Sequence, residues 1–367
     1  MKYRSSSPTP KIMFPVYRPY IGVEEEEVVL DCVKSKWISS RGEYIEKFEI
    51  EFANFIGVKK ATAVCNGTVA LHLALKALDV GPGDEVIVPS LTYIATANAV
   101  RYVGAVPVFA DSKLNTWNID PKNVRKKVTK KTKAIIAVHL YGNPCDLDEL
   151  SAICKANNLY LIEDAAEAFG SVYQNHFIGG YGDICTFSFF GNKTITTGEG
   201  GMVTSNNLNL IARTEFLKNQ GLSKTKEYWH EEIGFNYRMT NICAAIGLAQ
   251  LKKSKIILEK KQRIFNQYFH NLSNRYIFQN TTACCKNSYW MVTMLVNGNQ
   301  QERDKLRIHL RDNGIETRPI FYPLHTMGAH KESLNLPIAE SIAGRGINLP
   351  SYPDLTEDDI DQICRYL

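Results

Sequence analysis

One lysine stands in a stretch of sequence that would hold its side chain on irregular backbone. Lys193 lies in TFSFFGNKTITTGEGG (186–201), after an apolar run and before a glycine-rich turn. A lysine held in this way can act as a nucleophile and proton carrier if its surroundings keep the amine partly neutral. The same pattern also fits an ordinary surface lysine, so Lys193 alone does not define a reaction.

Two further segments could bind charged groups. Asp164 ends the apolar run LYLIED (159–164), and the carboxyl ends of parallel strands are where α/β proteins gather ligands. Asn66, Gly67 and Thr68 open an apolar helix, whose first N–H groups and dipole suit a phosphate. Each feature also has a simpler interpretation, because Asp164 could be a helix N-cap and Gly-Thr an ordinary helix start.

Together, a phosphate site, a carboxylate and a held lysine meet the needs of pyridoxal 5′-phosphate (PLP). The phosphate anchors the cofactor, and the carboxylate pairs with the protonated pyridine nitrogen so that the ring can withdraw electrons. The lysine forms the Schiff base and carries protons. Tyr93, near the start of the next helix, could stack on the ring or could be a core aromatic.

Alternating apolar segments predict the elements that position these residues. Strand-like runs at 85–89, 106–111, 133–142 and 159–164 alternate with helix-like runs, which lie at 24–36, 69–78, 97–103 and 146–157. Continuous apolar strands separated by helices predict an α/β fold with a mostly parallel sheet covered on both faces. The rhythm changes near residue 255, where a long charged helix leads into a smaller α+β region with an apolar run at 289–296 and helices at 302–312 and from 356. We therefore expect a tail (1–13), a large domain (14–255) and a small C-terminal domain (256–367).

Composition excludes several classes of protein. The 367 residues are 44% hydrophobic and 22% charged, which is typical of a globular protein and excludes intrinsic disorder. A net charge of +5 is far from the basic surface that nucleic-acid binding requires. The basic run RKKVTKKTK (125–133) is interpreted as a solvated helix end before a buried strand. No membrane span or secretory signal is expected, so we predict a cytoplasmic protein.

The cysteines point to a reducing compartment. Nine cysteines are scattered without a C-x-x-C pair or metal-ligand spacing, which predicts buried free thiols and no metal site. The adjacent pair Cys284 and Cys285 has no explanation at this level.

Six motifs in order resemble the DegT/DnrJ/EryC1/StrS sugar-nucleotide aminotransferases, which are PLP enzymes of fold type I. The resemblance covers roughly residues 14–367 and rests on WISSRG (37–42), CNGTVALHLAL (65–75), GPGDEVIVPSLTYIATANA (81–99), IEDAAEAFG (162–170), SFFGNKTITTGEGG (188–201) and GFNYRMTNICAAIGLAQL (234–251).

By position, the resemblance implies a role for each cofactor residue. Lys193 matches the family's Schiff-base lysine, Asp164 the partner of the pyridine nitrogen, and Glu167 the residue near the ring hydroxyl. The residues matching the phosphate site are Gly67, Thr68 and Ser188.

The resemblance also implies a homodimer with shared active sites. Asn236 matches a residue that reaches the phosphate from the neighbouring subunit. The positions that match the substrate side of the site are Trp37, Arg238, Tyr322 and His325.

The reaction implied is amino transfer from L-glutamate to C4 of a nucleotide-linked 4-keto-6-deoxy sugar, with pyridoxamine 5′-phosphate as the intermediate cofactor form. Within the family, WISSRG and ETRPIFYPLHTM (316–327) favour GDP-4-keto-6-deoxy-D-mannose as substrate. The same amination of a UDP- or dTDP-4-keto-6-deoxy-D-glucose stays open, because loops outside the motifs read the base and the sugar.

Related PLP-dependent sugar dehydratases carry histidine where this chain has Lys193, which disfavours dehydration. A non-enzymatic regulator would need a DNA-binding segment, for which the matched region leaves no room.

Overall fold

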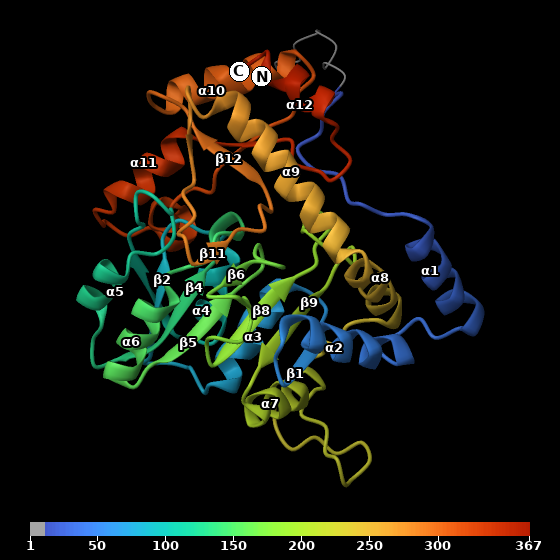
Figure 1. Cartoon of the computed structure of the whole chain (residues 1–367). Helices are drawn as coiled ribbons and strands as arrows, with labels where there is room; N and C mark the ends of the chain where they lie inside the picture. Colours follow the sequence, from blue (N-terminus) through green and yellow to red (C-terminus); the bar gives the residue numbers. More distant parts are fainter. Residues whose placement is uncertain (1–11) are drawn as a thin grey trace, which may run out of the picture.

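The computed structural model describes residues 12–367, and the expected tail at 1–13 lies almost entirely outside that range. Its largest element is a seven-stranded sheet (Figure 1). In spatial order the strands are β1 (Lys60–Val64), β9 (Gly201–Ser205), β8 (Ile184–Ser188), β5 (Tyr160–Asp164), β4 (Thr132–Val138), β2 (Glu85–Pro89) and β3 (Val106–Ala110). Only β9 runs against its neighbours, β1 and β8, so the other six strands of this sheet end at a common edge. The predicted mostly parallel α/β sheet is confirmed.

Helices cover both faces of this sheet, as the continuous apolar strands predict. Along β4, Ala134 and Ile136 belong to one buried cluster while Ile135 and Ala137 belong to the other, because successive side chains point to opposite faces. The first cluster includes side chains of α3 (Gly67–Ala77) and α4 (Ala95–Tyr102). The second includes side chains of α2 (Glu43–Ile56) and α6 (Leu147–Asn157). The remaining helices of the first 252 residues are α1 (Val23–Ser35), α5 (Pro121–Lys127), α7 (Leu208–Lys218) and α8 (Asn241–Lys252).

The C-terminal part is built around the long helix α9 (Ser254–Leu272), which rises away from the large sheet in Figure 1. Three of its side chains, Ile264, Tyr268 and Leu272, enter a third buried cluster, which is formed mostly by C-terminal residues. The four-stranded antiparallel sheet here has the order β10 (Ile277–Phe278), β12 (Val292–Leu295), β14 (Gly346–Leu349) and β13 (Arg318–Pro319). The helices are α10 (Gln300–Asp312), α11 (Pro337–Arg345) and α12 (Glu357–Cys364). The division into two domains at residue 255 stays a prediction.

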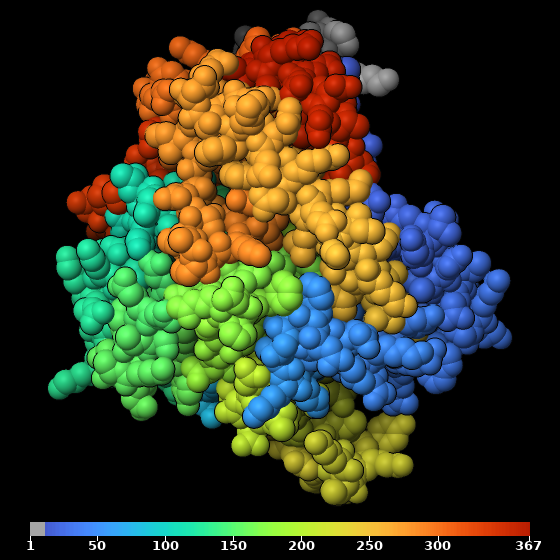
Figure 2. All heavy atoms as spheres, in the orientation of Figure 1, coloured from blue at the N-terminus to red at the C-terminus, as the bar shows by residue number. Residues whose placement is uncertain are grey.

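A small sheet joins the two parts of the chain. Strand β11 (Cys285–Lys286) pairs with β6 (Val172–Tyr173), which pairs with β7 (His176–Phe177). The C-terminal part (orange to red) stands over the blue-to-green part of the chain, against which it packs, in the space-filling view (Figure 2). Residues after position 280 therefore reach the edge where the parallel strands end.

One predicted strand is shorter than the sequence pattern indicated, and one apolar run forms a strand over only part of its length. The run 133–142 stops as a strand at Val138 and continues as a short 3-10 turn, Leu140–Gly142, in which Tyr141 has a positive φ of 55°. The run 289–296 begins as a strand only at Val292, after Tyr289 with a φ of 51°. Apolar character continues through both turns because their side chains are buried, so periodicity alone could not locate the strand ends. The basic run (125–133) begins in the last turn of α5, as predicted for a helix end, and its last two residues open the buried strand β4.

Within residues 12–367, no helix has the length and apolar character needed to cross a bilayer. No group of three or more His, Cys, Asp or Glu side chains in this range is placed to hold a metal ion. All nine cysteines are free thiols. The expectation that they are buried is right for Cys32, Cys145, Cys154 and Cys185, and wrong for the exposed Cys284.

The close approach of β9 to the turn before α3 can be tested at Gly201. A Cβ at this position would lie 2.7 Å from the Asn66 carbonyl carbon and 2.9 Å from the Phe187 oxygen. We expect Gly201→Ala to lower the free energy of unfolding by about 1–3 kcal/mol, because backbone must shift to admit the methyl group. The control is Gly344→Ala in α11, where a Cβ meets no heavy atom within 4 Å and helix propensity favours alanine by up to about 1 kcal/mol. Thermal unfolding midpoints check this, and equal midpoints for the two variants would contradict it.

Candidate active site

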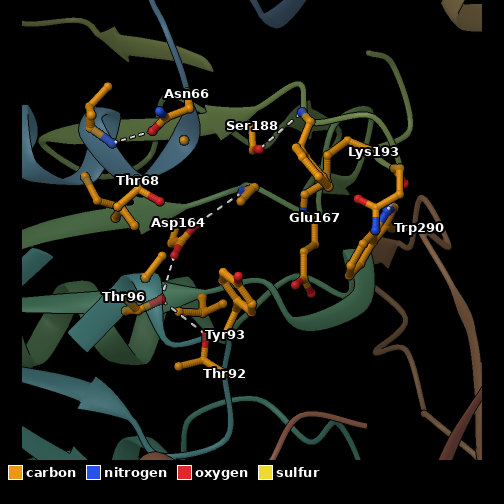
Figure 3. Close-up of a pocket in the computed structure, with 18 of the residues that line it drawn as sticks. Asn66, Thr68, Thr92, Tyr93, Thr96, Asp164, Glu167, Ser188, Lys193 and Trp290 are labelled. Carbon is orange, nitrogen blue, oxygen red and sulfur yellow. Dashed lines mark hydrogen bonds between the residues drawn. The ribbon is translucent and has the colours of Figure 1, made fainter. Parts of the chain in front are cut away.

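Four strands of the large sheet deliver polar residues to one cavity. Asn66 follows β1, Thr92 follows β2, Asp164 ends β5 and Ser188 ends β8. These strands run in the same direction, so their carboxyl ends meet, as expected for ligand sites in such sheets. The cavity has a volume of about 610 Å³, and Figure 3 shows these side chains around it.

The N-terminus of α3 forms an anion site on one side of the cavity. The Asn66 side chain caps the helix by accepting a hydrogen bond from Val69 N at 3.0 Å. The N–H groups of Gly67 and Thr68 belong to the first turn and have no intrahelical partner, and both residues line the cavity. A Cβ on Gly67 would lie 2.7 Å from Ser188 Cβ, so glycine is what allows the serine hydroxyl to approach this turn. Free N–H groups, a helix dipole and a hydroxyl together suit a phosphate.

Asp164 is a buried carboxylate held from two sides. Thr96 Oγ1 donates to its Oδ2 at 2.9 Å, and Ala166 N donates to its Oδ1 at 3.2 Å. Burial raises the pKa of Asp164, although both hydrogen bonds and the positive charge of Lys193 act in the opposite direction. A cation placed beside this carboxylate would favour its ionised form. The site therefore fits a protonated pyridine nitrogen.

Lys193 brings its amine into the same cavity. Its Nζ lies 3.9 Å from the centroid of the Trp290 ring, and the two side chains lie together in Figure 3. Burial lowers the pKa of Lys193, while the negative charges of Glu167 and Asp164 oppose that shift. Burial thus favours the neutral amine that nucleophilic attack requires.

Glu167 is the second buried carboxyl group of the cavity. Its Oε2 accepts a hydrogen bond from Tyr141 N at 2.7 Å. Burial raises the pKa of Glu167 to about 7, against the opposing effects of Lys193 and the Tyr141 bond. At neutral pH this group can therefore hold or release a proton.

Of the other predicted residues, Tyr93 lines the cavity and the remaining five do not. Tyr93 is 58% exposed, and its ring centroid lies 5.7 Å from that of Phe321. Asn236 accepts hydrogen bonds from Arg238, which also donates to Asn219. This cluster lies outside the residues that line the cavity.

Trp37, Tyr322 and His325 also lie outside the cavity lining. Trp37 is 56% exposed just after α1, and Tyr322 is 42% exposed with the Arg303 guanidinium 5.8 Å from its ring. His325 is buried, with Ser90 Oγ at 2.7 Å from its Nδ1 and Glu340 at 3.1 Å from its Nε2. In this chain His325 therefore holds the turn after β2 and does not face the cavity.

Sequence reasoning missed two residues that shape the site. Trp290 was seen only as part of the apolar run 289–296, and its role depends on a turn of the C-terminal part reaching the large sheet. Thr96 lies in α4, and a threonine in an apolar helix gives no signal by itself. Thr92 precedes α4, and the turn between them brings its Oγ1 to 3.2 Å from Thr96 Oγ1, which helical spacing could not have indicated.

Glu167 generates a pH-dependent prediction. Its pKa rises from 4.5 to about 7 on folding, so the folded chain binds more protons than the unfolded chain in that window. Stability therefore falls as the pH rises through it. In cofactor-free protein we therefore compare the free energy of unfolding of Glu167→Gln with that of wild type. We expect this difference to be more favourable to the variant at pH 8 than at pH 5, by on the order of 1–3 kcal/mol. Urea unfolding at both pH values measures this difference. The exposed Glu51→Gln is the control and should show no such difference, and a pH-independent gap for Glu167→Gln would refute the assignment.

Comparison with known proteins gives the chain's relatives. GDP-perosamine synthase of Escherichia coli O157:H7 is 52% identical over 351 residues, covering 95% of this chain and 96% of that protein. GDP-perosamine synthase of Vibrio cholerae is 46% identical over 358 residues, covering 96% of this chain and 97% of that protein.

The solved putative sugar aminotransferase Spr1654 of Streptococcus pneumoniae superposes in its PMP-form with a TM-score of 0.91 at 29% identity, covering 96% of each chain. Its PLP-form superposes with a TM-score of 0.90 and the same coverage. The sequence profile of the DegT/DnrJ/EryC1/StrS aminotransferases matches residues 19–367. The chain therefore belongs to the DegT/DnrJ/EryC1/StrS aminotransferase family.

Proposed function

We propose that this chain is a PLP-dependent sugar-nucleotide aminotransferase of the cytoplasm. It transfers the amino group of L-glutamate to C4 of GDP-4-keto-6-deoxy-D-mannose and so forms GDP-perosamine. The observation that carries the proposal is the meeting of three features in one cavity: the Lys193 amine, the Asp164 carboxylate and the N-terminus of α3. The GDP-sugar assignment is supported by relatives named GDP-perosamine synthase at 52% and 46% identity over nearly the whole chain.

The cavity has a group for each part of the cofactor. Gly67, Thr68 and Ser188 would hold the phosphate, and Asp164 would pair with the ring nitrogen. Tyr93 would cover a face of the ring and Glu167 would lie near its hydroxyl. When bound, PLP supplies a carbonyl that condenses with primary amines and a protonated ring that withdraws electrons.

The chain's own groups handle the protons. Lys193 Nζ, whose pKa burial lowers, would take the α-proton of the amino donor and would later deliver a proton to sugar C4. Asp164 would favour the protonated form of the ring nitrogen, because a buried carboxylate is stabilised by a cationic partner. Glu167, with a pKa of about 7, holds or releases a proton beside the ring hydroxyl. Trp290, Phe190 and Phe321 line the cavity and give it an apolar wall.

A nucleotide-sugar panel tests the substrate. We expect kcat/KM with L-glutamate to be highest for GDP-4-keto-6-deoxy-D-mannose when GDP-, UDP- and dTDP-4-keto-6-deoxy sugars are compared, by a factor of about 100 or more. A site built to hydrogen-bond one base leaves buried polar groups unpaired with another. Lys193→Ala serves as the inactive control and should lose turnover with every sugar. A preference for a UDP- or dTDP-sugar would overturn the GDP assignment and leave the aminotransferase assignment standing.

The functional unit in this proposal is a homodimer that completes each cavity with residues of both chains. Asn236 and Arg238 lie outside the cavity of a single chain, and so does Trp37. Large exposed side chains flank them: Ile21 (49%), Leu30 (51%) and Val33 (57%) at α1, and Tyr228 (94%), Trp229 (51%) and Ile233 (87%) after α7. Figure 1 shows the segment after α7 projecting from the large sheet. Exposed apolar groups in this number are typical of an interface.

Mixing two defective variants tests the shared site. Lys193→Ala lacks the amine, and Asn236→Ala lacks the group that we place on the neighbour's phosphate. In a co-expressed equal mixture, half of the dimers are mixed, and each mixed dimer has one intact site. We therefore expect recovery of roughly one quarter of wild-type activity, as two-fold symmetry requires. No recovery above the separate variants would show that Asn236 serves its own chain or none.

A further inference from the structure

Lys261 is a buried cation outside the cavity. It lies on α9, is 1% exposed, and donates from Nζ to Trp290 O at 2.7 Å and to Ser351 O. Its Nζ also lies 5.1 Å from the centroid of the Tyr17 ring. Among the described residues no carboxylate pairs with it, so burial lowers the pKa of Lys261 to about 7.

A charge held only by neutral groups is costly to bury. An apolar side chain of similar length would fill the same space, and replacing buried ions in this way is often neutral or stabilising. The free-energy cost of burying this ammonium group indicates that Lys261 has a role besides stabilising the fold. The contacts of Lys261 indicate which role.

Both aromatic residues that Lys261 contacts also hold the backbone of the Lys193 turn. The Trp290 indole Nε1 donates to Asn192 O at 2.6 Å. The Tyr17 hydroxyl donates to Lys193 O at 2.8 Å. Two consecutive carbonyl groups of the turn are therefore fixed by two side chains from distant parts of the chain. The Trp290 ring also contacts the Lys193 amine itself.

We propose that Lys261 is a positioning residue for Lys193, acting through Tyr17 and Trp290. Lys261 gathers the N-terminal segment, the turn before β12 and the segment after β14 around one ammonium group. The segments are joined a second time, because Ser351 N donates to Val16 O at 3.0 Å and Val292 N donates to Ser351 Oγ at 2.9 Å. This arrangement fixes the two carbonyl groups at the end of the turn that carries the reactive amine. The inference rests on the proposed role of Lys193. It adds Lys261, which does not line the cavity, to the residues that support this role.

The test uses variants that remove one contact each. Lys261→Met removes the ammonium and keeps the stem, Tyr17→Phe removes the bond to Lys193 O, and Trp290→Phe removes the bond to Asn192 O while keeping an aromatic face. Tyr268→Phe is the matched control, because it removes a buried hydroxyl of α9 that has no hydrogen-bond partner among residues 12–367. Leu272→Ala is the stability control, because it opens a cavity at a fully buried position of the same helix, eleven residues beyond Lys261.

Two readouts report on Lys193 separately from turnover. In cofactor-free protein, peptide mass spectrometry measures the rate at which acetic anhydride modifies Lys193, with the exposed Lys47 as internal reference. On addition of PLP, the rate of growth of the cofactor's absorption band at the edge of the visible range reports capture by Lys193. We expect Lys261→Met to slow band formation by on the order of 10-fold to 100-fold, because a displacement of about 1 Å can cost this much. The labelling rate of Lys193 relative to Lys47 should also change.

The single-bond variants make the inference falsifiable even if Lys261→Met fails to fold. Tyr17→Phe and Trp290→Phe should each slow band formation, and their effects should not add to that of Lys261→Met, because contacting residues couple. Tyr268→Phe and Leu272→Ala should leave both readouts at wild-type values, although Leu272→Ala lowers the melting temperature. If Lys261→Met or both single-bond variants behave like Leu272→Ala, losing stability with unchanged Lys193 readouts, the inference is wrong. A wild-type protein that forms no band with PLP would instead overturn the proposed function, and the labelling rates would still decide the role of Lys261.

Discussion

The desolvation of one amine is the constraint on which the rest of the site depends. In water a lysine amine is protonated and unreactive as a nucleophile. Burial lowers the pKa of Lys193, and the negative charges of two neighbouring carboxyl groups oppose this shift without reversing it. The neighbouring Asp164 and Glu167 are themselves buried, and their pKa values are raised. The three groups therefore share charge and protons, and a bound cation or proton at any one of them changes the other two.

The large sheet supplies the geometry for this balance. Parallel strands bring Asp164 and Ser188 to one edge, and the absence of a side chain at Gly67 allows α3 to begin against Ser188. The same edge thus combines a positive site, made by the start of a helix, with a negative site at the end of a neighbouring strand. A ligand that has a phosphate at one end and a basic ring nitrogen at the other matches this separation of charge.

The C-terminal part completes the site by closing it. Trp290 and Phe321 come from beyond residue 280 and line the cavity. Lys261 joins Trp290 to the N-terminal segment, because its amine contacts both Trp290 O and the Tyr17 ring. His325 connects to the turn after β2 through Ser90 and so holds the loop that carries Thr92 and Tyr93. Residues far from the chemistry in sequence thus determine how tightly the reactive amine is held.

Sequence patterns alone predicted a mostly parallel sheet with four of its strands, at 85–89, 106–111, 133–142 and 159–164, and the helices between them. They also singled out Lys193, Asp164 and the Gly67-Thr68 turn as groups that one cofactor could bring together. These features follow from local rules, because apolar runs mark buried strands and parallel strands end at a common edge. Tertiary structure alone decided the rest. Trp290 and Tyr141 belong to apolar runs that end in tight turns, and no periodicity shows that their groups contact Lys193 and Glu167. Tyr17, Lys261 and Asn192 meet only because three distant segments pack together, and burial, which determines the proton affinities of the site, is a property of that packing.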